Sequence, residues 1–268
     1  MKKLLITCTG LLCMFIGQSQ SIKVTTGKKM NVVTEMKTNM TMSAMGQDVD
    51  VDLTNTLTNE YEVTAVTDKG YSLRTKVTRM QMSNKAMGME KGFDSNNETD
   101  RNDPMWAEVV KLLNKPSDIV IDDHMASVTS GEIMNSMSQF GLKDNAPELM
   151  KFILYKSDLD QMKMGYRWTD SMHTKDYNIT NEFVVTGLSA TEIELSVKTS
   201  VMINTSMQQN GMEATVAFHG DTNSKRYYDR ISGTLIREDS NTKMEGSTEV
   251  MGQKIPMKMT GSATLTVK

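Results

Sequence analysis

Residues 254–267 alternate between apolar and polar side chains along their whole length. The odd positions are apolar apart from Gly261, and the even positions are polar apart from Pro256. Successive side chains of a strand point to opposite faces, so a period of two predicts a β-strand with one buried and one solvated face. Residues 192–203 and 71–78 repeat the pattern. Together these stretches predict antiparallel strands, because a sheet with one wet face is typical of antiparallel pairing.

The predicted strands are long. The stretch 192–203 alone contains 12 residues, whereas a typical strand has about 5–6. Strands of such length twist and coil, which favours a curved sheet over a flat layer. We therefore expect an α+β, mainly β protein with a long curved antiparallel sheet, either a half-barrel or barrel-like.

The middle of the chain loses the period of two. Asp103 can cap a helix that has Pro104 at its first position. Residues 118–128 are predicted to form a hairpin, and further helices are expected to begin near Ser130 and after Pro147. These elements predict two to four helices packed against the concave face of the sheet.

The order of these patterns suggests one domain. Strands are predicted over 20–100 and 165–268, with the helical middle over 103–163 between them. No Pro-, Gly- or Ser-rich linker divides residues 20–268. Segregated strands and helices in one cooperative unit are typical of an α+β domain.

The first residues have the pattern of a secretory signal peptide. Two lysines precede an apolar run over 4–16, and small residues follow at Gly17 and Ser19. We expect a signal peptide over residues 1–19, although cleavage after Ser21 would also satisfy the small-residue rule. Cleavage at either position would remove both cysteines and export the rest of the chain to the periplasm or the outside. Lipid anchoring is the weaker interpretation, because neither Cys8 nor Cys13 follows a small residue.

Two short motifs carry a resemblance. Together with the export signal and the helical middle, Gly-Phe-Asp-Ser at 92–95 and Gly-Tyr-Arg-Trp at 165–168 resemble an uncharacterised family of exported Bacteroidota proteins. That family is known only as a domain of unknown function, so the resemblance implies no activity and no site residues. The layout is also similar to half-barrel lipoprotein carriers of the bacterial envelope, in which a curved sheet wraps around helices.

Charge and catalytic residue types exclude several functions. A net charge of −3 and a pI near 5.7 give no electrostatic reason to bind nucleic acid. The three histidines, His124, His173 and His219, are scattered, and no nucleophile motif is present. We therefore expect a non-enzyme without a cofactor. A membrane-spanning β-barrel is also disfavoured, because only 6% of residues are aromatic.

Methionine is abundant, with 26 residues, and five pairs have Met-x-Met spacing. The pairs are Met40/Met42, Met80/Met82, Met87/Met89, Met162/Met164 and Met257/Met259. On a strand each pair would project two thioethers to one side, which suits Cu(I). Methionine is also an adaptable apolar filler, and this second interpretation is favoured.

The apolar face of the predicted sheet is the candidate binding site. An apolar face that borders a cavity for a lipid or another apolar molecule would include Ile193, Leu195, Ile255, Met257 and Met259. The alternatives are a structural or interaction protein with a filled core, which would use its surface for an envelope protein partner, and a Met-based Cu(I) protein.

A separate prediction places the strand with Asp48, Asp50 and Asp52 beside the strand with Lys254 and Lys258, because opposite charges that face one another across strands attract.

Overall fold

A computed structural model describes residues 24–44, 47–67, 70–122, 125–130, 152–154, 159, 161–173, 175–209, 212–250 and 252–268. The strands are β1 (Lys29–Ala44), β2 (Gln47–Val66), β3 (Gly70–Ala86), β4 (Met89–Asp94), β5 (Pro116–Asp122), β6 (Met125–Ser130), β7 (Arg167–His173), β8 (Tyr177–Leu188), β9 (Glu192–Gln209), β10 (Met212–Asp229), β11 (Leu235–Val250) and β12 (Gln253–Val267). They form one 12-stranded antiparallel sheet in the order β6-β5-β3-β2-β1-β12-β11-β10-β9-β8-β7, with β4 paired to β3. The residues predicted as the signal peptide lie outside the described residues.

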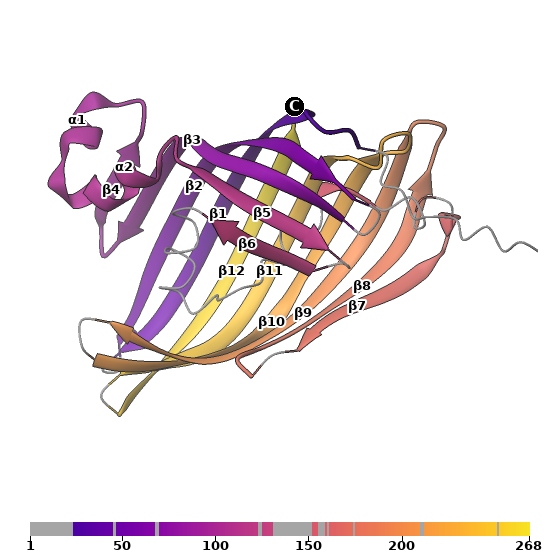
Figure 1. Cartoon of the computed structure of the whole chain (residues 1–268). Coiled ribbons are helices and arrows are strands. Elements are labelled where there is room, and N and C mark those ends of the chain that lie inside the picture. The colour runs from indigo at the N-terminus through magenta and orange to yellow at the C-terminus, as the bar shows by residue number, and fades with distance from the viewer. Residues whose placement is uncertain are drawn as a thin grey trace, which may run out of the picture.

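The sheet curls on itself without closing. Within the described chain, β6 and β7 are its two edges. Figure 1 shows β5 and β6 passing in front of β11 and β12, so the two halves of the sheet curl toward one another around its concave side. The mainly β, half-barrel fold expected from the sequence is therefore confirmed. The strands are longer than expected, since β2 has 20 residues and β9 and β10 have 18 each.

One end of the concave side is packed with apolar side chains, and we call it the core end. Ile119 of β5 and Leu195 of β9 belong to the same buried cluster, which shows that the two halves of the curled sheet meet there. Phe152 and Ile153 lie in that cluster, with the ring of Phe152 4.9 Å from the ring of Tyr61. A short segment of the middle region thus fills the concavity at the core end.

The opposite end carries the β1–β2, β9–β10 and β11–β12 connections, and we call it the hairpin end. Gly220 and Gly246 allow neighbouring strands to approach closely there. A Cβ on Gly246 would lie 2.0 Å from the carbonyl oxygen of Ala217, and one on Gly220 would lie 2.1 Å from that of Lys243. Only glycine fits such an approach, and glycines of this kind help a sheet to curve.

The helical middle is shorter than predicted among the described residues, and it lies elsewhere. Helices α1 (Glu98–Asn102) and α2 (Ala107–Leu112), with the 3₁₀ turn η1 (Pro104–Trp106) between them, lie beside β4 rather than on the concave face (Figure 1). The side chain of Asp103 accepts a hydrogen bond from the Met105 backbone N–H, as expected of a cap. Strands β5 and β6 form the predicted hairpin. The helices expected to begin near Ser130 and after Pro147 lie outside the described residues over 131–151.

The predicted pairing of the acidic strand with the basic strand is wrong. Strands β2 and β12 are not neighbours, because β1 lies between them and pairs with both. The three aspartates instead accept hydrogen bonds from β1, from Ser43 to Asp48 (2.5 Å), from Thr41 to Asp50 (2.7 Å) and from Asn39 to Asp52 (2.6 Å). Neutral hydroxyl and amide donors of β1 thus stand where Lys254 and Lys258 were expected, and on the other side of β2 Lys85 of β3 lies opposite Asp52.

Candidate functional site

The inner face of the sheet is divided by a row of polar side chains. The ladder pairs residues across six strands in one row, from Asn181 through Thr199, Thr222, Thr242 and Gly261 to Thr38. Thr199 donates to Asn181 over 2.7 Å, and the Thr222 and Thr242 hydroxyls are 2.9 Å apart. This row separates the buried core end from a second apolar region at the hairpin end.

The second apolar region is only partly covered. Its side chains are half-buried, in contrast to the core end. They include Ile255, Met257 and Met259 of β12, Met40 and Met42 of β1, Val216 and Phe218 of β10, and Val201 and Ile203 of β9. A concave apolar surface that stays partly accessible can receive an apolar molecule.

The structure does not bring the five predicted lining residues together. Ile193 and Leu195 are fully buried in the core, whereas Ile255, Met257 and Met259 are half-buried at the hairpin end. Ile255 shares a row with Thr205 of β9, through Thr248 and Val216. Ile193 lies twelve residues from Thr205 along β9, which corresponds to about 40 Å at roughly 3.3 Å per residue. All five occupy one face, but at opposite ends.

Two of the predicted Met-x-Met pairs meet across strands. Met40 lies directly opposite Met259, and Met42 lies opposite Met257. On the other side of β12, Met244 also lies opposite Met259. Sequence spacing showed each pair separately but could not show that β1 and β12 are neighbours, because more than 200 residues separate them. We call these five residues the methionine cluster.

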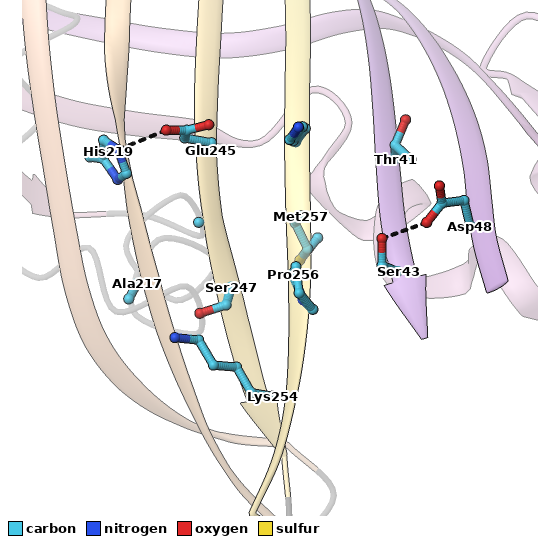
Figure 2. A pocket seen from close by; sticks show the side chains of 12 residues that line it. Thr41, Ser43, Asp48, Ala217, His219, Glu245, Ser247, Lys254, Pro256 and Met257 are labelled. Atoms are coloured by element: carbon cyan, nitrogen blue, oxygen red, sulfur yellow. Dashed lines mark hydrogen bonds and ion pairs between the residues drawn. The ribbon is translucent and has the colours of Figure 1, made fainter. Parts of the chain in front are cut away.

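The outer face of the same strands carries a shallow polar groove of about 630 Å³. Figure 2 shows His219 and Glu245 along one side of it and Ser43 with Asp48 along the other. Nε2 of His219 lies 3.2 Å from Oε1 of Glu245, and both side chains are more than half exposed. A second groove of about 550 Å³ shares His219 and Glu245. Acidic and basic side chains occur together in both grooves, so neither groove has a strong preference for an anion or a cation.

The surroundings of Tyr177 and Asp229 shift the pKa of each side chain. Burial, followed by the charge of Asp176, raises the pKa of Tyr177, which lies at the start of β8. Hydrogen bonds from the Ser232 hydroxyl and backbone lower the pKa of Asp229 at the core end.

No group of three His, Cys, Asp or Glu side chains that could hold a metal occurs among the described residues. No helix in the described parts of the chain is long and apolar enough to span a membrane.

Comparison with known proteins gives only distant similarity. No family model and no curated protein matches the chain. It is similar to the structure of an outer membrane channel from Pseudomonas putida F1 at 9% identity and a TM-score of 0.30, over 94% of this chain and 98% of that one. It is also similar to OccK7 (OpdD) of Pseudomonas aeruginosa at 8% identity and a TM-score of 0.24, over 90% and 98% of the two chains. At such TM-scores the similarity supports no conclusion about function.

Proposed function

We propose that this is an exported, non-enzymatic envelope protein whose inner sheet face holds an apolar molecule, such as a lipid, at the hairpin end. The observation that carries this proposal is the contrast between the two ends of one face. Leu195 and Ile193 are buried at the core end, whereas Ile255, Met257 and Met259 remain half-buried at the other. Each Å² of apolar surface left in water forgoes about 25 cal/mol, so binding an apolar molecule there is favourable.

The lining of that surface suits a chain-like or variable ligand. Unbranched methionine side chains adjust to different shapes, and surfaces rich in methionine bind varied apolar partners. The row with Thr222 and Thr242 would mark the limit of the apolar ligand, because its hydroxyls already satisfy one another. Export is supported by the signal-peptide pattern over residues 1–19.

The filled-core alternative is favoured at the core end by a specific observation. Ile153 forms a bridge to Thr234, and Phe152 packs on Tyr61 within the buried cluster. These contacts fill that part of the concavity among the described residues. The two interpretations therefore apply to different ends of the molecule, and the ligand is assigned to the hairpin end alone.

The test places a charge on either face of one strand. Val216 of β10 is in the inner row of Ile255, while its neighbour Thr215 points outward opposite Glu249. We expect Val216→Lys to weaken binding of the neutral fluorescent probe N-phenyl-1-naphthylamine about tenfold or more, since a lysine on an apolar site must be desolvated. Thr215→Lys should bind the probe like the parent protein.

Native mass spectrometry of protein purified from its own envelope would identify the natural ligand. A co-purifying lipid that is lost from Val216→Lys supports the proposal. A clean apo mass together with no probe binding by the parent protein would overturn it, as would equal probe binding by the two lysine variants.

A further inference from the structure

The methionine cluster brings five thioethers onto one face of three adjacent strands. Met259 is at its centre, with Met40 opposite on β1 and Met244 opposite on β11. Met42 and Met257 form the next pair toward the hairpin connections. Side chains directly opposite in an antiparallel pair have Cβ atoms about 4.5–5.5 Å apart. Flexible methionine side chains at that spacing can direct three sulfur atoms to a common point.

The neighbours of the cluster on the described strands carry no charge. Its two rows continue into Val49 and Val51 on β2 and into Gly246 and Gly220 toward β10, and none of these carries a carboxylate or an imidazole. The Thr248 hydroxyl donates a hydrogen bond to Sδ of Met257 over 3.4 Å. Among these described neighbours a hard divalent cation would find no anionic oxygen, whereas a soft cation needs only sulfur.

The position of the cluster is also unusual for an apolar filler. At the core end, the face is built mainly from branched residues such as Val32, Ile119 and Ile193, which suit strands. At the hairpin end, methionine takes these places on β1, β11 and β12, and all five side chains stay half-buried. Partial exposure leaves the sulfurs accessible to an ion from solvent.

From this register we infer that the methionine cluster is a thioether site for a soft monovalent cation, Cu(I) or its analogue Ag(I). The site would take one ion, held by Met259 with Met40 and with Met42, Met244 or Met257 as further ligands. This inference does not rest on the apolar ligand proposed above, because it uses the sulfur atoms rather than the apolar area.

The chemistry of thioether ligands makes metal binding at this site independent of pH, which distinguishes it from a cysteine or histidine site. Cysteine and histidine must lose a proton to bind a metal, so their affinity rises with pH. A thioether has no such proton. Affinity of the cluster for Ag(I) should therefore stay constant between about pH 5 and pH 8, a range in which a histidine site would weaken on acidification.

The experiment compares two double variants that each remove one Met-x-Met pair from a strand. Met257→Leu with Met259→Leu removes the central sulfurs of the cluster. Met80→Leu with Met82→Leu is the matched control, because Met80 and Met82 face Leu57 and Asn55 on β2 rather than other methionines. Leucine keeps the volume and the apolar character, so both variants should fold.

Competition with a chromogenic Cu(I) chelator under anaerobic conditions, and native mass spectrometry with Ag(I), supply the two readouts. We expect the parent protein and the control to bind one ion each. The cluster variant should bind the ion with an affinity at least about tenfold lower. No competition by the parent protein, or equal losses in both variants, would overturn the inference. Binding of the apolar probe should survive in the cluster variant, so failure of one proposal can be told from failure of the other.

Discussion

Arg226 and Glu238 form an ion pair within the inner face of the sheet. Nε of Arg226 lies 3.2 Å from Oε1 of Glu238, and the two side chains are only 12% and 7% exposed. The residues are directly opposite on β10 and β11, between Leu195 and Leu265 in the same row. The Arg226 guanidinium also lies 5.8 Å from the ring centroid of Phe183. A charge pair in such a position must be kept together, because either partner alone would be a buried charge.

Removing one partner of this pair should destabilise the protein strongly. We expect Glu238→Leu to lower the free energy of unfolding by about 3–5 kcal/mol, since it leaves the Arg226 charge without its carboxylate. The double variant Arg226→Met with Glu238→Leu should recover much of that loss. Urea denaturation of the single and double variants measures both effects, and a double variant no more stable than Glu238→Leu would contradict this account.

The close approach at Gly246 predicts a second large effect. An alanine Cβ there would lie 2.0 Å from the Ala217 carbonyl oxygen and 2.8 Å from Cα of Phe218, so one strand would have to move. We expect Gly246→Ala to cost about 3 kcal/mol or more. Gly261→Ala is the control, because the added Cβ would come no nearer than 3.2 Å to a neighbouring atom. This substitution should cost about 1 kcal/mol or less. The urea midpoints of the two variants provide the comparison.

Asp229 predicts a change of stability with acid. Its Oδ1 accepts hydrogen bonds from the backbone N–H of Ser232 (2.6 Å) and from the Ser232 hydroxyl (2.7 Å), and these lower its pKa. A carboxyl with a lowered pKa in the folded state stabilises the protein above its unfolded pKa of about 3.9, and the benefit disappears as pH falls through the folded pKa.

Ser232→Ala should therefore be less stable than the parent protein at neutral pH, by about 1 kcal/mol for the lost hydroxyl donor. The difference should shrink as pH falls below about 4 and through the lowered folded pKa of Asp229, where the carboxyl takes up a proton in the parent protein as well. Thermal unfolding from pH 7 to pH 2 follows the two proteins together. A difference that is constant over this range would show that the hydroxyl acts without the charge of Asp229.

The packing of Phe152 tests whether the core end is filled. Phe152 is 3% exposed and belongs to the buried cluster with Tyr61 and Ile153. We expect Phe152→Ala to lower the free energy of unfolding by about 3–5 kcal/mol, as for a fully packed aromatic side chain. Ile231→Ala, at a side chain that is 70% exposed, should change it by less than about 0.5 kcal/mol. Similar values for the two would mean that the segment only rests on the sheet.

The sequence by itself determined the local structure. Alternation of apolar and polar residues is a direct consequence of strand geometry, so residues 192–203 and 254–267 could be assigned to strands with a known inner face. The cap at Asp103 and the hairpin of β5 and β6 were likewise predicted from short-range signals. The length of the strands also indicated a curved sheet.

Only the tertiary structure decided which strands are neighbours, and with them the candidate sites. A period of two specifies the face of a residue but not its partner, so charge was a poor guide, and on β1 the aspartates of β2 accept hydrogen bonds from Asn39, Thr41 and Ser43 instead of meeting Lys254 and Lys258. Ile193 and Ile255 have the same pattern in the sequence, yet one is buried and the other is half-buried at the far end. Met40 and Met259 come together because β1 pairs with β12 in the middle of the sheet, a contact between distant segments that no local pattern records.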